Sequence, residues 1–201
     1  SDHVTEVSVT RSGILDLDAL TARLAAHDLA DGLPLVAVML VNNETGIIQP
    51  IREVSAIVKK FGGLLVVDAV QAAGRNPLSI AELGADFLIL SAHKLGGPKG
   101  VGALVSRGET LMPEPLVRGG GQEKGHRAGT ENLAAIAGFG AAAREMASEL
   151  AQRNARLTEL RDRAEQAMLS VAPDTVIYGR SEARVGNTSF FHLPGLKAET
   201  G

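Results

Sequence analysis

The sequence contains no cysteine among its 201 residues. This absence excludes disulfides, thiolate metal sites and a thiol nucleophile within the chain. No apolar run is long enough to cross a bilayer, and the net charge of −3 is spread without a basic stripe, so we expect neither a membrane nor a nucleic acid as partner. The amino end has no basic segment followed by an apolar one, and we therefore expect a cytoplasmic protein.

Apolar runs and helical periodicities alternate along the first half of the chain. Residues 35–41 are continuously apolar, which predicts a strand covered on both faces. Residues 101–105 would form a strand that runs back antiparallel. This rhythm predicts an α/β fold with a mainly parallel, doubly wound sheet. The strands are expected at residues 4–9, 35–41, 64–68, 85–91 and 101–105, and the helices at 16–27, 50–61 and 80–83.

The second half of the chain has a different character. Residues 118–130 are too rich in glycine for a regular element, but they carry groups that hold anions or partner backbones. Residues 131–171 are helical in pattern, and the charges at 153–163 suggest a solvated face. A strand at 187–193 would begin a new unit. We therefore divide the chain into residues 1–170 and an incomplete second domain, residues 171–201. The groups in the glycine-rich loop are Arg118, Gln122, His126, Arg127 and Thr130.

Two of the predicted strands end in side chains that together indicate chemistry. Asp68 follows the apolar residues 64–67, and Lys94 lies in a glycine-containing loop just after the strand at 85–91. Parallel strands present their carboxyl ends at one edge of the sheet. A lysine kept neutral by apolar surroundings can attack a carbonyl. Pyridoxal phosphate needs such an amine for a Schiff base and a carboxylate for its ring nitrogen. Taken singly, Lys94 reads as a surface lysine and Asp68 as a turn residue.

Four motifs in sequence order resemble those of the cysteine desulfurases, which belong to the class V aminotransferase group of pyridoxal-phosphate enzymes. The resemblance covers nearly the whole chain, and the glycine-rich block favours desulfurases over other members of the group. It implies the large domain of a pyridoxal-phosphate-dependent transferase, with the start of a small α+β domain. The motifs are Val-Asn-Asn-Glu-Thr-Gly at 41–46, Asp-Ala-Val-Gln at 68–71, Ser-Ala-His-Lys at 91–94 with 97–100, and residues 119–123 leading to 127–132.

The resemblance implies a role for each matching position. Lys94 would form the Schiff base and then move the substrate proton, and Asp68 would pair with the pyridine nitrogen. Thr130 would reach the cofactor phosphate of a neighbouring subunit, which implies a homodimer. For Asn42, Gln71 and Ser91, a turn cap or loop hydrogen bond is the competing interpretation. The implied cofactor ligands are Asn42, Asp68, Gln71, Ser91, His93, Lys94 and Thr130.

The family's sulfur-accepting cysteine has no counterpart here, and the resemblance places it in a carboxyl-terminal part of the parent enzyme. We expect this chain to be the middle of a larger enzyme that converts L-cysteine to L-alanine, and to be inactive alone. The sulfur would pass to an acceptor or an iron–sulfur scaffold protein. Two alternatives stay open: a related aminotransferase or selenocysteine lyase, and a catalytically silent binding or dimerisation module. No metal site is expected.

Overall fold

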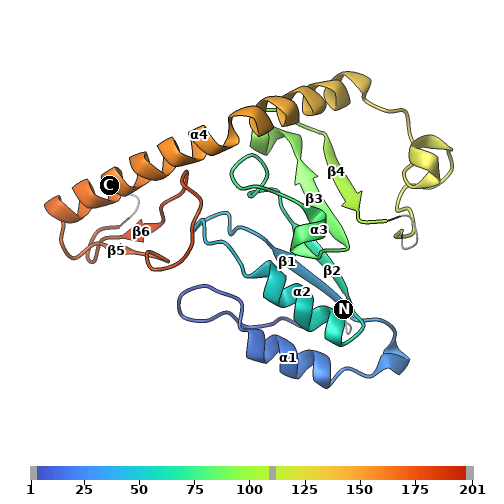
Figure 1. Ribbon diagram of the computed structural model, residues 1–201, viewed down its shortest axis with the longest axis horizontal. Helices are drawn as coiled ribbons and strands as arrows, with labels where there is room; N and C mark the ends of the chain where they lie inside the picture. The colour runs from blue at the N-terminus through green and yellow to red at the C-terminus, as the bar shows by residue number, and fades with distance from the viewer. Residues whose placement is uncertain (1–3, 109–111, 198–201) are drawn as a thin grey trace.

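A four-stranded sheet forms the centre of the molecule (Figure 1). The computed structural model describes residues 4–108 and 112–197. The first three strands are parallel, and the fourth is antiparallel to the third. This order confirms the predicted mainly parallel sheet and the returning last strand. In spatial order the strands are β1 (Leu35–Met39), β2 (Leu64–Asp68), β3 (Phe87–Ser91) and β4 (Gly102–Ser106).

Helices pack against one face of this sheet and build the core with it. Helix α1 begins where the Asp16 carboxylate accepts hydrogen bonds from the N–H groups of Asp18 and Ala19, which satisfies two of the donors that a helix start leaves free. Val54 and Val58 of α2 are fully buried and lie in one core cluster with apolar residues of β2. These helices confirm the predicted ones. They are α1 (Leu17–Ala25), α2 (Ile51–Lys60) and α3 (Ile80–Leu83), with a short 3₁₀ helix η1 (Leu29–Asp31) before β1.

The opposite face of β1 remains open, so the prediction that this strand is covered on both faces is wrong for the described residues. Val36 and Val38 pack against the core, whereas Leu35, Ala37 and Met39 are exposed. Successive side chains of a strand point to opposite faces. The continuous apolar run showed that both faces of β1 are hydrophobic, but it could not show whether this chain supplies the layer that covers the second one.

The predicted strand at residues 4–9 is also wrong. The described part of this segment is irregular, and Val9 forms only an isolated antiparallel bridge with Leu15. Val4 and Val9 are both exposed. Alternating side chains permit a strand, but its backbone groups need a neighbouring strand to bond with, and no described strand pairs with this segment beyond that bridge.

A long helix, α4 (Leu133–Val171), joins the two ends of the molecule (Figure 1). It confirms the predicted helix and begins at Asn132, whose side chain accepts a hydrogen bond from the N–H of Ala135. Its carboxyl end leads to a small two-stranded sheet of β5 (Val176–Ile177) and β6 (Phe191–His192). The strand predicted at 187–193 is thus shorter, and β5 was not predicted. Residues 198–201 of the predicted second domain lie outside the described residues.

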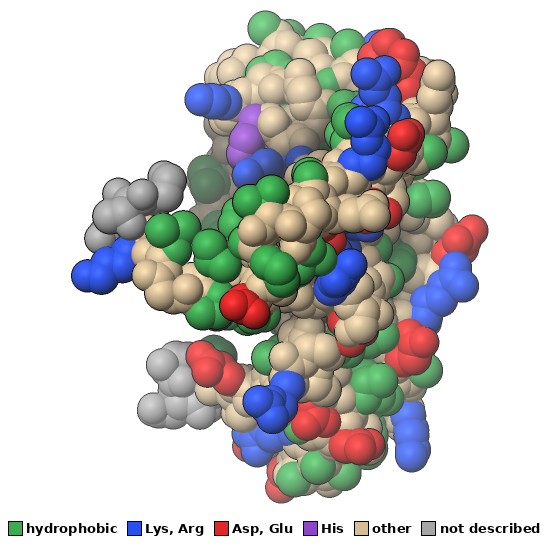
Figure 2. All heavy atoms as spheres, turned by 90° about the vertical axis from the view of Figure 1, so that its left-hand side faces the viewer, with side chains coloured by type: hydrophobic (Ala, Val, Ile, Leu, Met, Phe, Trp, Pro, Cys, Tyr) green, Lys and Arg blue, Asp and Glu red, His purple; other side chains and the backbone are tan. Residues whose placement is uncertain are grey.

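Charges of both signs are interspersed over the face in Figure 2, as the sequence indicated. The long helix α4 carries many of them, and its mixed composition differs from that of a membrane span. Across residues 4–108 and 112–197, no helix is long and apolar enough to cross a membrane.

Candidate functional site

Asp68 and Ser91 lie at one edge and on one face of the sheet. Asp68 is the last residue of β2, and its register partner in β3 is Ile89. Ser91 follows two residues later in β3 and therefore points to the same face as Ile89 and Asp68. Asp68 Oδ1 accepts a hydrogen bond of 2.9 Å from the N–H of Val70. This is the contact expected of a turn residue, the alternative interpretation of Asp68 in the sequence analysis. The Asp68 carboxylate is exposed, and within the described residues Oδ2 accepts no hydrogen bond.

Lys94 lies in the 3₁₀ helix η2 (Ala92–Leu95) that directly follows β3. Ser91 Oγ and His93 Nδ1 are 2.9 Å apart, so the first turn of this loop holds a hydroxyl and an imidazole together. Both His93 and Lys94 are exposed. The apolar surroundings that we predicted for Lys94 are therefore absent from the described structure, because the buried residues of the loop are its neighbours Ala92 and Leu95.

Arg75 connects the loop after β2 with the loop after β3. Its Nη1 donates to the Gln71 carbonyl at 3.0 Å, and its Nη2 donates to the Lys94 carbonyl at 3.2 Å. Burial of the guanidinium, together with the charge of Arg153, lowers the pKa of Arg75. Sequence analysis missed this residue, because no local pattern shows that its side chain reaches a carbonyl nineteen residues later. Gln71 itself is half-buried in the turn after β2.

Asn42 caps the turn that follows β1. Its Oδ1 accepts hydrogen bonds of 2.9 Å from the N–H groups of Glu44 and Thr45, and a third from the Thr45 hydroxyl. Its Nδ2 lies 3.5 Å from Met39 Sδ, a weak contact. The turn-cap interpretation is therefore correct for the oxygen of Asn42, and its amide N–H groups are the part of the side chain with donor capacity to spare.

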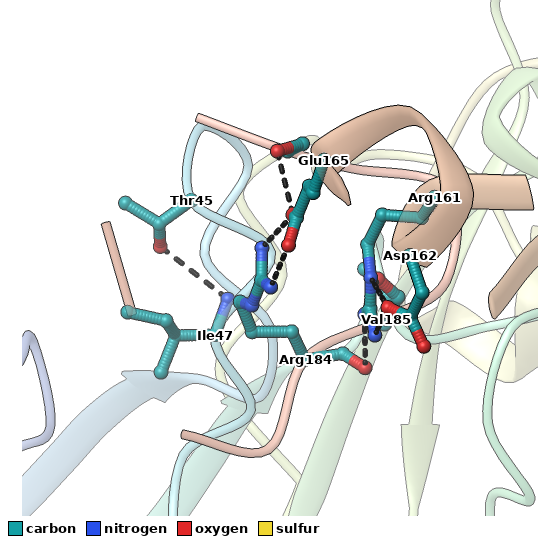
Figure 3. A network of polar contacts seen from close by, with 8 residues as sticks. Thr45, Ile47, Arg161, Asp162, Glu165, Arg184 and Val185 are labelled. Atoms are coloured by element: carbon teal, nitrogen blue, oxygen red, sulfur yellow. Dashed lines mark hydrogen bonds and ion pairs between the residues drawn. The ribbon is translucent and has the colours of Figure 1, made fainter. Parts of the chain in front are cut away.

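A buried ion pair lies beyond the Asn42 turn (Figure 3). Arg184 donates to both oxygens of Glu165 at 2.8 and 3.0 Å, and the two side chains are only 3% and 5% exposed. Ser189 Oγ adds a hydrogen bond of 2.7 Å to Glu165. Burial by itself raises the pKa of Glu165, but the hydrogen bonds from Arg184 and Ser189 and the charges of Arg184 and Arg161 outweigh it, so the pKa lies below its ordinary value.

This ion pair fixes a segment that bonds to the Asn42 turn. The N–H of Val185 donates to the Gly46 carbonyl and the N–H of Ile48 donates to the Ala183 carbonyl, both at 2.9 Å. Gly46 has φ +72°, and a Cβ there would lie 2.8 Å from Thr188 Cβ, so the close approach requires glycine.

The charged stretch 153–163 of α4 is only partly solvated, which corrects the sequence interpretation. Arg161 donates to the carbonyls of Arg184 and Val185, and Arg153 donates to the carbonyl of Gly74. Arg163 and Glu159 remain exposed. Helical spacing alone did not separate the inward-pointing members of this run from the outward-pointing ones.

Thr130 lies in the segment 112–132, which extends away from the sheet in Figure 1. Thr130 is exposed on this segment, and its role at a neighbouring subunit's cofactor stays a prediction. The arginines of this segment pair within it: Arg118 with Glu114, and Arg127 with Glu123. The segment also contains the 3₁₀ helix η3 (Gln122–Gly125).

The groups at the sheet edge suit pyridoxal phosphate. The Lys94 amine matches its aldehyde, the Asp68 carboxylate matches its pyridinium nitrogen, and the adjacent Ser91 hydroxyl and His93 imidazole match its phosphate oxygens. These groups come from adjacent parallel strands that end together, which is where open α/β sheets bind ligands. No group of three or more His, Cys, Asp or Glu residues in the described ranges could hold a metal ion.

Known proteins similar to this chain are cysteine desulfurases. A cysteine desulfurase of Nostoc sp. strain PCC 7120 is 43% identical over 197 residues, which is 98% of this chain and 48% of the relative. The cysteine desulfurase IscS of Dictyoglomus turgidum is 39% identical, over 98% of this chain and 49% of its own length. The chain thus spans about half the length of these curated relatives.

Solved structures show the same similarity. The NifS-like protein of Rickettsia africae superposes with a TM-score of 0.88 at 36% identity, over 96% of this chain and 52% of the other. The apo cysteine desulfurase of Thermococcus onnurineus gives a TM-score of 0.82 at 28% identity, over 97% and 51%. The family described as aminotransferase class-V matches residues 2–200. With the match covering nearly every residue, the chain belongs to the aminotransferase class V family.

Proposed function

We propose that this chain supplies the reactive lysine and most of the cofactor contacts of a pyridoxal-phosphate-dependent cysteine desulfurase. The observation that supports it is the placement of Asp68 and the Lys94 loop at the ends of adjacent parallel strands. The names of the relatives point to the same activity. Residues 1–170 would be the carboxyl half of the cofactor domain, and residues 171–201 the start of the small domain.

Each side chain has a distinct task in this proposal. Bound pyridoxal phosphate supplies an aldehyde and an electron-accepting ring. The Lys94 amine would hold the cofactor at its aldehyde and would serve as the base for the proton on the α-carbon of L-cysteine. Asp68 keeps the ring nitrogen protonated. Ser91 and His93 hold the phosphate, Gln71 contacts the ring's phenolic oxygen, and the amide N–H groups of Asn42 face cofactor and substrate carboxylate.

Sulfur transfer requires a group that this chain lacks. A thiolate must attack the substrate sulfur, and the sequence contains no cysteine. The acceptor cysteine is therefore in polypeptide outside these residues, and L-alanine is the product. The sulfur would then go to iron–sulfur cluster or thiocofactor assembly in the cytoplasm, a use consistent with the IscS name of one relative.

A homodimer belongs to the same proposal. The segment 112–132 bears a fully exposed leucine, Leu116, and α4 begins with the exposed Leu133. Apolar side chains of this size on an extended segment favour burial against a partner. A second copy seated there would bring Thr130 toward its neighbour's cofactor. Sedimentation of the protein should show a dimer, and Leu116→Asp should shift it toward monomer. A monomer at micromolar concentration would contradict this part.

The cofactor experiment tests the proposal directly. Pyridoxal phosphate added to the chain should give a yellow adduct that borohydride traps, and peptide mass mapping should place it on Lys94. Lys94→Ala should abolish the adduct, whereas Lys99→Ala, five residues along the same loop, should retain it. A colourless protein would favour a silent binding module. Product analysis of the complete enzyme separates alanine and sulfide from the keto acid of an aminotransferase, and activity on selenocysteine alone would indicate a lyase.

A further inference from the structure

Arg75 is the side chain that ties together the two loops carrying the proposed cofactor groups. One of its guanidinium nitrogens donates to the carbonyl of Gln71, and another donates to the carbonyl of Lys94. The first carbonyl belongs to the turn after β2 and the second to η2 after β3. We call this pair of contacts the Arg75 bridge. A planar guanidinium can hold two acceptors in a fixed relative position, which a lysine ammonium on a flexible stem does less well.

The acceptors of the Arg75 guanidinium are backbone carbonyls rather than a carboxylate. Arg75 is half-buried, and no carboxylate of the described residues lies within ion-pair distance of it. Burial and the nearby positive charge of Arg153 lower the pKa of Arg75. A cation kept in such a place without an acidic partner must be held by its carbonyl acceptors, and these acceptors are the loop carbonyls themselves.

Two side chains of helix α4 donate hydrogen bonds to the backbone of the same turn. Arg153 donates to the carbonyl of Gly74, and Asn154 donates to the carbonyl of Arg75. A Cβ on Gly74 would lie 3.3 Å from Leu95 Cβ and 3.5 Å from Met146 Cγ, so the turn is packed between η2 and α4. These contacts hold only the backbone of the turn, and the Arg75 guanidinium is the group that extends from the turn to the Lys94 carbonyl.

We propose that Arg75 is a positioning residue that sets where Lys94 stands relative to Asp68 and Gln71. This rests on the proposed function in one respect, the identity of Lys94 as the cofactor lysine. The Arg75 bridge acts on the backbone of Lys94, so it controls the origin of the reactive side chain without touching the reacting atoms. Displacement of a reacting group by even a small distance lowers rates strongly.

The test compares Arg75→Met with Arg153→Met. Both remove a guanidinium that donates to the turn at 71–75, but only Arg75 reaches Lys94. With pyridoxal phosphate and borohydride, Arg75→Met should slow formation of the trapped Lys94 adduct about tenfold or more, and Arg153→Met should leave it near the unsubstituted rate. Arg75→Lys should give an intermediate rate, because one ammonium can keep one of the two contacts. Equal slowing by both methionine variants would overturn the proposal.

A second measurement needs no cofactor. Hydrogen exchange of the unloaded chain should speed up at residues 70–76 and also at residues 92–97 in Arg75→Met, but only at residues 70–76 in Arg153→Met. Unchanged exchange at 92–97 in Arg75→Met would refute the bridge. A chain without any Lys94 adduct would instead refute the proposed function, and the exchange result would still decide whether the bridge exists.

Discussion

Helix α4 is attached to the rest of the molecule at two places, near its carboxyl end and near its middle, and the two attachments differ. Toward its carboxyl end, Glu165 and Arg184 form a buried, two-pronged ion pair that holds the segment bonded to the Asn42 turn. Nearer its middle, Arg153 and Asn154 donate to backbone carbonyls of the turn at 74–75. One attachment buries opposite charges, and the other orients a loop through neutral acceptors.

This difference indicates where stability and chemistry are concentrated. The ion pair is withdrawn from water, so losing one partner leaves an uncompensated buried charge. The groups beside the other attachment, Asp68 and Lys94, are exposed. A side chain in a loop that is held by backbone contacts can be substituted without unfolding the protein. We therefore expect substitutions at the carboxyl-terminal attachment to affect stability most, and those at the middle attachment to affect loop order.

The largest expected effect comes from removing one member of the ion pair. Glu165→Leu should lower the free energy of unfolding by about 3–5 kcal/mol, because Arg184 then stays buried without its partner. Urea unfolding followed by circular dichroism measures this. Glu159→Leu changes the same residue type on an exposed part of α4 and should cost less than about 1 kcal/mol. Similar losses of stability in the two variants would show that the buried ion pair contributes no more than an exposed glutamate does.

The double variant Glu165→Leu with Arg184→Met sharpens the same point. Replacing both charges by apolar groups removes the desolvation cost as well as the attraction. It should therefore recover much of the stability lost in Glu165→Leu. A double variant less stable than the single one would mean that the hydrogen bonds, rather than the charge balance, dominate the site.

The sequence predicted the sheet edge better than it predicted this pair. Two apolar runs predicted the strands β2 and β3, which end at Asp68 and Ser91. Because neighbouring parallel strands end at the same edge of a sheet, the residues that follow them lie at that edge. Glu165 and Arg184 are 19 residues apart in different elements, and no periodicity joins them. Arg75 escaped notice for the same reason. The prediction that Lys94 has apolar surroundings was wrong, because the burial of a side chain depends on which other segments pack around it.

The second-largest loss of stability is expected where an added methyl group would collide with α4. Gly186 passes so close to α4 that a Cβ there would lie 2.6 Å from both the backbone N and the Oγ1 of Thr158. Gly186→Ala should cost about 1–3 kcal/mol, since the helix backbone cannot yield as a flexible side chain would. Gly121→Ala is the matched control, because a Cβ there meets nothing within 4 Å. Thermal unfolding of both variants measures the difference, and equal melting temperatures would exclude a tight contact.

The pH dependence of stability should follow Glu165. Its pKa in the folded chain lies below the ordinary value, so the folded state binds this proton less readily than the unfolded state. The stabilisation is then complete above the ordinary pKa and is lost as the pH falls through the lowered one. Glu165→Gln should therefore flatten the acid side of a plot of unfolding free energy against pH. An equally steep slope in Glu165→Gln would contradict the assignment.

The smallest effect is expected at the middle attachment. Asn154→Ala removes one hydrogen bond to the Arg75 carbonyl and should cost about 1 kcal/mol. Gln152→Ala, an exposed neighbour on α4, should cost less. Hydrogen exchange in Asn154→Ala should increase at residues 72–76 and stay unchanged at 183–189, because the two attachments share no partner. Faster exchange at 183–189 would mean that α4 transmits the loss along its length, and the two attachments would then form one cooperative unit.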